Sequence, residues 1–104
     1  MIIVLNSDKN IETNTKQTEY YQSYIEDHLD RFSDHITRIE VHFSDENAGK
    51  TGPDDKRCVL EARLEKRQPM AVKANQNTVE QALFDAVDKI KASLSTYYGR
   101  LRNH

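Results

Sequence analysis

Three consecutive segments of this 104-residue chain alternate strictly between apolar and polar residues, and this pattern constrains the fold most. The segments span residues 38–44, 58–65 and 70–74. Because neighbouring side chains of a strand point to opposite faces, each segment predicts a strand with one buried face. The inward side chains are Ile39, Val41, Phe43, Cys58, Leu60, Ala62, Leu64, Met70, Val72 and Ala74. Polar connections at residues 45–56 and 66–68 separate the strands, which favours an antiparallel meander.

Two segments with helical periodicity can cover that apolar face. Residues 15–32 and 79–101 place apolar side chains three or four positions apart, which predicts two amphipathic helices. The first stripe consists of Tyr21, Tyr24, Ile25, His28, Leu29 and Phe32, and the second of Val79, Leu83, Ala86, Ile90, Leu94, Tyr97 and Leu101. Thr13, Asn14 or Thr15 can cap the first helix, and Asn77 or Thr78 the second.

A short apolar run at residues 2–5 precedes the first helix and predicts a further strand. The expected order is therefore β-α-β-β-β-α. A four-stranded sheet with both helices packed on one face buries every apolar surface, which is a two-layer α+β fold. The length of the chain is that of one domain, so we expect residues 1–104 to form a single domain.

The net charge of −2 hides a strong asymmetry along the chain. Residues 1–55 contain 5 basic and 12 acidic side chains, whereas residues 56–104 contain 10 basic and 5 acidic ones. No acidic residue follows Asp88. This polarity indicates an acidic partner for the C-terminal half.

No constellation typical of catalysis or metal binding is present. Cys58 lies on the apolar side of a strand, which is typical of a buried structural thiol. His28 lies on the first helical stripe, where a packed imidazole is the simpler interpretation, and His35 and His42 lack further ligands at metal-binding spacing. We expect no enzyme activity, small-molecule substrate, metal or cofactor.

The N-terminus and the cysteine content indicate where such a chain functions. The apolar start is too short for a signal peptide, and no run approaches the roughly 20 apolar residues that span a bilayer. One cysteine excludes an intramolecular disulfide. We expect a cytoplasmic protein without a membrane partner.

The basic side chains are candidates for contact with RNA phosphates. Cations on rigid elements can align with phosphates, and nearby aromatic rings can stack on unpaired bases. The alternative is an ordinary solvated surface, with Tyr97 in the core. The candidate residues are Arg57, Arg63, Lys66, Arg67, Lys73, Lys89, Lys91, Arg100 and Arg102.

Several segments, in the correct order, resemble the ribosome hibernation promoting factor family, also called ribosome-associated inhibitor or sigma-54 modulation protein. The resemblance rests on residues 31–42 (RFSDHITRIEVH), 45–47 (DEN), 53–58 (PDDKRC), 61–63 (EAR), 67–69 (RQP) and 82–94, which includes 88–90 (DKI). It covers nearly the whole chain and implies the same β-α-β-β-β-α order.

The resemblance implies a function in translation. Members of the family bind the small ribosomal subunit and its 16S rRNA in the channel for mRNA and tRNA, which inhibits translation and promotes hibernation under stress. The basic positions of the family's second helix correspond to Lys89, Arg100 and Arg102, with Lys91 as a further cation.

The chain departs from better-known members at two points. Thr96 and Tyr98 occupy positions where lysines are expected. The loss of these lysines removes phosphate contacts, so we expect a lower affinity for the ribosome and a smaller dependence of that affinity on salt. The chain stops at His104, so we expect no C-terminal domain that pairs ribosomes.

Two other functions remain open from the sequence. One is a protein-interaction module for an acidic or sigma-factor-like partner. The other is a double-stranded RNA-binding domain, because that domain also places helices on one face of a sheet.

Overall fold

The computed structural model describes residues 1–47, 52 and 55–102, with the backbone alone for 100–102. The elements are β1 (Ile2–Ser7), α1 (Thr15–Leu29), the short 3-10 helix η1 (Asp30–Phe32), β2 (Ile36–Asp45), β3 (Lys56–Leu64), β4 (Met70–Gln76) and α2 (Val79–Arg102). The predicted β-α-β-β-β-α order is confirmed. The first helix ends three residues earlier than predicted, because its last turn tightens into η1. Much of the predicted loop at 45–56, namely residues 48–51 and 53–54, lies outside the described residues.

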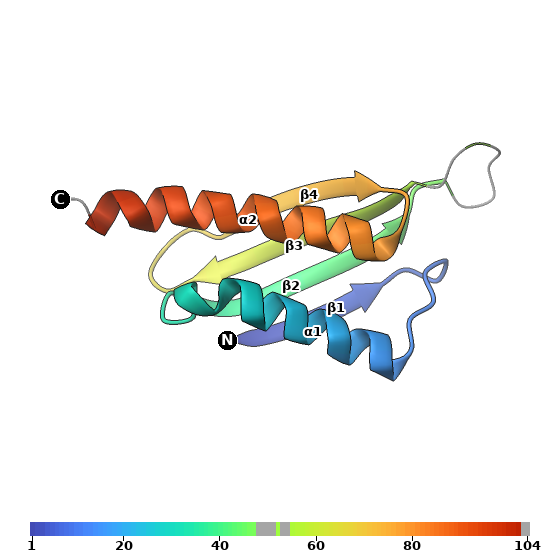
Figure 1. Cartoon of the computed structure of the whole chain (residues 1–104), viewed down its shortest axis with the longest axis horizontal. Helices are drawn as coiled ribbons and strands as arrows, with labels where there is room; N and C mark the ends of the chain where they lie inside the picture. Colours follow the sequence, from blue (N-terminus) through green and yellow to red (C-terminus); the bar gives the residue numbers. More distant parts are fainter. Residues whose placement is uncertain (48–51, 53–54, 103–104) are drawn as a thin grey trace.

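The four strands form one sheet in the order β1-β2-β3-β4 (Figure 1). β2, β3 and β4 are antiparallel neighbours, so the predicted meander is confirmed. β1 pairs with β2 in parallel, because α1 returns the chain to the end of the sheet where β1 began. This topology brings the C-terminal end of α1, the β3–β4 turn and the C-terminal end of α2 to the same end of the sheet (Figure 1).

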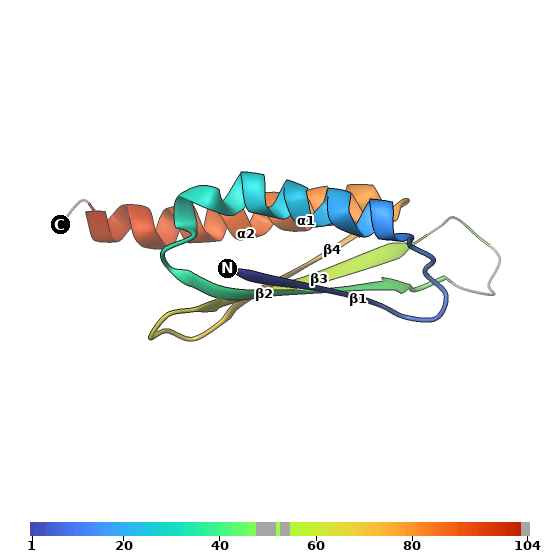
Figure 2. The ribbon, with the colours of Figure 1, turned by 90° about the horizontal axis from the view of Figure 1, so that it is seen from below.

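Both helices cover the same face of the sheet, as predicted (Figure 2). The core lies between the two layers, and its fully buried side chains include Ile25, Phe43, Leu60 and Ile90. The tyrosine ring of Tyr21 meets Phe43 edge to face, with centroids 5.8 Å apart. Burial of this apolar surface is the main force that holds the helices on the sheet.

The helix starts follow from local sequence. Asn14 caps α1 in a complete capping box, because its side chain accepts from the Gln17 N–H while the Gln17 side chain accepts from the Asn14 N–H. Thr78 caps α2, since its Oγ1 accepts from the Gln81 N–H at 3.1 Å. Both caps are among the predicted candidates.

Cys58 is fully buried in β3, which confirms the prediction of a structural thiol. Burial raises the pKa of the thiol to about 12. The thiolate is the reactive form, so the native protein should react with a thiol reagent at pH 8 about 1,000-fold more slowly than the urea-unfolded chain. Ellman's reagent measures both rates, and similar rates would show that Cys58 is accessible.

The C-terminal turns of α2 extend beyond the β3–β4 turn, so no strand lies beneath them (Figures 1 and 2). The prediction that Tyr97 belongs to the core is wrong, because it is neither among the buried core residues nor among the partly buried ones packed against them. Tyr97 is partly buried and packs against Arg67 of the turn instead. The predicted core position of Leu101 lies outside the described side chains.

Candidate nucleic-acid interface

The β3–β4 turn holds two of the predicted cations beside α2. Lys66 adopts a left-handed conformation with φ of 60°, and the adjacent Arg67 N–H donates to the Leu64 carbonyl. The Arg67 guanidinium lies over the Tyr97 ring, 4.9 Å from its centroid. Lys66 and Arg67 are exposed, and neither forms an ion pair with a carboxylate of the described residues. Their charges are available to a ligand.

Lys91 lies on the stripe of α2 that faces α1. It is seven residues from both Phe84 and Tyr98, a spacing that places all three on the same helical face. Phe84 stacks on Tyr24 of α1 with centroids 4.1 Å apart. Tyr24 in turn stacks on His28, whose Nδ1 is 2.9 Å from the Tyr24 carbonyl oxygen. The prediction that His28 is packed and satisfied is confirmed.

Lys73 and Lys89 lie together at the free edge of the sheet. β4 is the edge strand, and the Lys89 Nζ donates to the Lys73 carbonyl at 3.0 Å. The same Nζ is 3.8 Å from Asp85, one helical turn earlier, which is an exposed and weak pair. Lys73 is exposed on the sheet face opposite the helices, opposite Val59 in register.

Arg57 and Arg63 lie on the outer face of the sheet, where carboxylates partly neutralise them. Arg57 Nη1 is 2.9 Å from Glu46 Oε1. Arg63 Nε donates to Glu61 at 3.0 Å, and its Nη2 is 3.5 Å from Glu40. These arginines are less available to phosphate than the cations of the turn.

The ion pairs shift the pKa values of the groups involved. The hydrogen bond to Glu61, with Glu40 nearby, raises the pKa of Arg63. The hydrogen bond from Arg38, supported by Arg63, lowers the pKa of Glu40. Glu40 therefore stays ionised beside the arginines, which lowers the positive potential of the outer face.

Arg100 and Arg102 belong to the last turn of α2, but their side chains lie outside the described part of the structure. The C-terminal end of α2, to which both belong, lies at the same end of the molecule as the β3–β4 turn (Figure 1). Their role in binding RNA stays a prediction.

Arg31 and His35 also lie at this end, although the sequence pattern does not identify them as candidates for contact with RNA. Phe32 and His35 contact Tyr98 of α2, a residue more than 60 positions away. Arg31 is exposed and forms no ion pair with a described carboxylate. Only the topology of the fold identifies these two residues, because it brings the end of α1 next to the end of α2.

The described residues also bear on metal ligation and on membrane crossing. No three His, Cys, Asp or Glu side chains of this part converge as metal ligands. Neither helix, within the described ranges, combines the length and apolar character that crossing a bilayer requires.

Comparison with known proteins identifies the family. The model of the family described as "Sigma 54 modulation protein / S30EA ribosomal protein" matches residues 8–102. The fold is similar to the Protein Y N-terminal domain of Thermus thermophilus (TM-score 0.73, 22% identity, 93% of this chain and 99% of that chain). It is also similar to a ribosomal subunit interface protein from Coxiella burnetii (TM-score 0.74, 16% identity, 95% of this chain and 99% of that chain).

A search of curated proteins found no match. The two structural similarities support the fold, and the family match covers most of the length of the chain. The chain therefore belongs to the sigma-54 modulation protein / S30EA ribosomal protein family, whose members are non-enzymatic regulators associated with the ribosome.

Proposed function

We propose that this protein binds the small ribosomal subunit in the channel for mRNA and tRNA, and that it acts in the cytoplasm. Occupation of the channel blocks translation and keeps idle ribosomes intact under stress. The family assignment supports binding to the ribosome, and the Coxiella burnetii relative is described as a subunit interface protein.

The unpaired cations of the β3–β4 turn are the observation that carries this proposal. Lys66 and Arg67 belong to the β3–β4 turn, which lies beside the C-terminal part of α2, and Arg67 covers the Tyr97 ring of that helix. Phosphates of 16S rRNA supply the opposite charge, and each contact releases counterions, which stabilises the complex at low salt. The mechanism is steric: no bond is made or broken, and the bound domain excludes mRNA and tRNA.

Acidic side chains on α1 restrict the orientation of the bound protein. Glu19, Glu26 and Asp27 are exposed on that helix and repel phosphates. The end that carries Lys66 and Arg67 should therefore face the rRNA, while the exposed surface of α1 faces solvent or protein.

Sedimentation with purified 30S subunits at two salt concentrations tests the proposal. We expect co-sedimentation that weakens with salt, with a slope of roughly −0.7 to −0.9 per phosphate contact on logarithmic scales. We also expect the bound protein to displace initiator tRNA from the subunit. No co-sedimentation, or binding that leaves tRNA and mRNA in place, would contradict the channel as the binding site.

The same preparation distinguishes the other two functions. A partner that stays bound after nuclease treatment, without ribosomal proteins, would favour an acidic protein partner. Equal affinity for a plain RNA duplex and for 30S subunits would favour a general binder of double-stranded RNA.

A further inference from the structure

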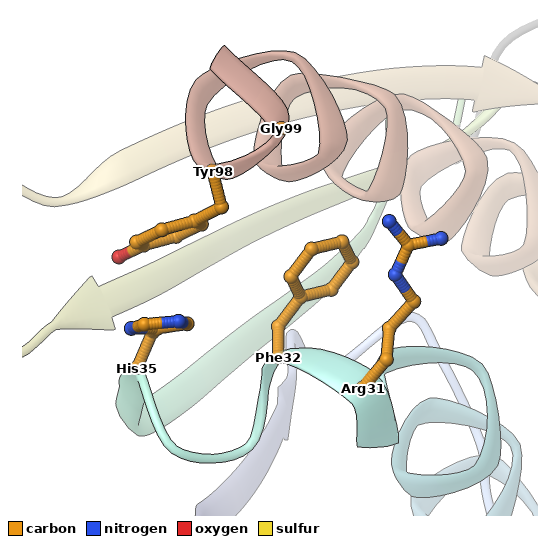
Figure 3. Close-up of a pocket in the computed structure, with 5 residues that line it drawn as sticks. All are labelled: Arg31, Phe32, His35, Tyr98 and Gly99. Atoms are coloured by element: carbon orange, nitrogen blue, oxygen red, sulfur yellow. The ribbon is translucent and has the colours of Figure 1, made fainter. Parts of the chain in front are cut away.

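A small pocket opens where the end of α1 meets the end of α2 (Figure 3). It has a volume of about 80 Å³ and is lined by Arg31, Phe32, His35, Tyr98 and Gly99. The volume suffices for a few water molecules or phosphate oxygens but not for an enclosed nucleobase. A base that binds here must therefore lie on the rim of the pocket.

A row of aromatic and guanidinium groups forms this rim. Arg31 lies over the Phe32 ring at 4.6 Å, and the Phe32 and Tyr98 centroids are 6.2 Å apart. Tyr98 stacks on His35 with centroids 3.9 Å apart and an interplanar angle of 14°. Figure 3 shows the His35 and Tyr98 rings face to face, with Arg31 on the far side of Phe32.

The row continues on the other side of Tyr98. Tyr97 meets Tyr98 edge to face at 4.9 Å, and Arg67 lies over Tyr97. The rings thus connect η1, the start of β2, the end of α2 and the β3–β4 turn, with an exposed arginine at each end. Such contacts hold the rings in place before a ligand arrives, which lowers the entropic cost of binding.

His35 is the member of this row that offers a free aromatic face. Tyr98 covers one face of the imidazole and His35 is nevertheless exposed, so we assign the opposite face of the ring to a ligand. Its backbone is fixed on both sides: its N–H donates to the Phe32 carbonyl, and its carbonyl accepts from the Glu65 N–H, each at 2.9 Å. Lys66 and Arg67 follow Glu65 directly, so the cations of the turn lie beside this platform.

We propose that His35, stacked on Tyr98, is the platform for one unpaired RNA base, and that Arg31 and the cations of the β3–β4 turn bind the phosphates next to that base. A free aromatic face with flanking cations matches a nucleotide of single-stranded RNA, which presents a π face and a charged backbone together. A lone anion would not use the stacked rings, and an apolar ligand would not use the arginines. The inference deepens the proposed function and rests on it for the source of the RNA.

Substitution of His35 isolates the stacking contact. His35→Ala should weaken binding to a single-stranded RNA 12-mer and to 30S subunits by on the order of 10-fold, because each stacked base contributes a comparable factor. His35→Phe, which keeps an aromatic face without an ionisable group, should retain the affinity of the wild type. His42→Ala is the matched control, since His42 is an exposed histidine on the opposite face of the sheet in β2 and should not matter.

An abasic oligonucleotide of the same length distinguishes the contribution of the base to the affinity from that of the phosphates. It should bind to the wild type and to His35→Ala with equal affinity, because the base that uses the platform is absent. Thermal melts of each variant check that the exposed substitution leaves the fold intact.

The outcomes separate this inference from the proposed function. If His35→Ala binds the 12-mer and 30S subunits as tightly as the wild type does, the proposed stacking platform is wrong. The proposed binding to the ribosome would be unaffected by that result. Equal weakening by His35→Ala and His35→Phe would show a role of charge or hydrogen bonding, which also overturns the platform. If the wild type fails to bind 30S subunits, the proposed function fails, and the 12-mer still tests the platform.

Discussion

Replacement of both Lys66 and Arg67 with glutamate should abolish co-sedimentation with the 30S subunit at physiological salt. The two side chains are exposed and lack carboxylate partners among the described residues, so reversal of their charges turns two attractions into repulsions. A hydrogen bond to a charged group contributes about 1.5–3 kcal/mol, so the affinity should fall by at least ~100-fold. The salt slope of the remaining binding should decrease by about 2.

The matched control reverses two lysines at the other end of the molecule. Lys9→Glu with Lys16→Glu changes the net charge by the same amount, and both residues are exposed near the start of α1. This variant should keep most of its affinity, because only long-range, screened electrostatics change. Equal loss in the two variants would show that net charge, and not the β3–β4 turn, governs binding.

Phe43→Ala should produce the largest loss of stability among substitutions of single core residues. The side chain is only 1% exposed, lies in β2, one of the two inner strands, and packs edge to face on Tyr21 of α1. Removal of a buried phenyl group leaves a cavity and costs about 3–5 kcal/mol of the free energy of unfolding. For a chain of this length, the melting temperature should fall by roughly 15–25 °C.

Urea denaturation measures this loss, and Val59→Ala is the control. Val59 lies in the neighbouring strand β3, but its side chain points away from the helices and is 37% exposed. Its truncation should cost less than ~1 kcal/mol. A cost below ~1 kcal/mol for Phe43→Ala as well would mean that the two-layer core is not packed as described.

The alternation of residues 38–44, 58–65 and 70–74 was sufficient to predict three antiparallel strands and their buried face. This worked because a strand has a side-chain period of two, so the local pattern alone assigns each residue to a face. The helical stripes and the capping residues Asn14 and Thr78 are equally local signals. These local signals could not predict the parallel pairing of β1 with β2, because that pairing depends on how α1 crosses the sheet.

The availability of the cations could not be predicted in the same way. Arg57 and Arg63 resemble Lys66 and Arg67 in the sequence, yet only the first two form ion pairs with glutamates of the described residues. Glu40 reaches Arg63 from a different strand, so the strand register decides this neutralisation. A list of basic residues contains no information about register.

Local sequence by itself determined the element order, the buried face of the sheet, the inert thiol of Cys58 and the family. These properties depend on periodicity and on the identity of residues close together in the chain. The tertiary structure decided which charges remain unpaired, where the sheet ends beneath α2, and that Tyr98 meets His35. Those outcomes depend on contacts between distant segments, which only the path of the folded chain brings together.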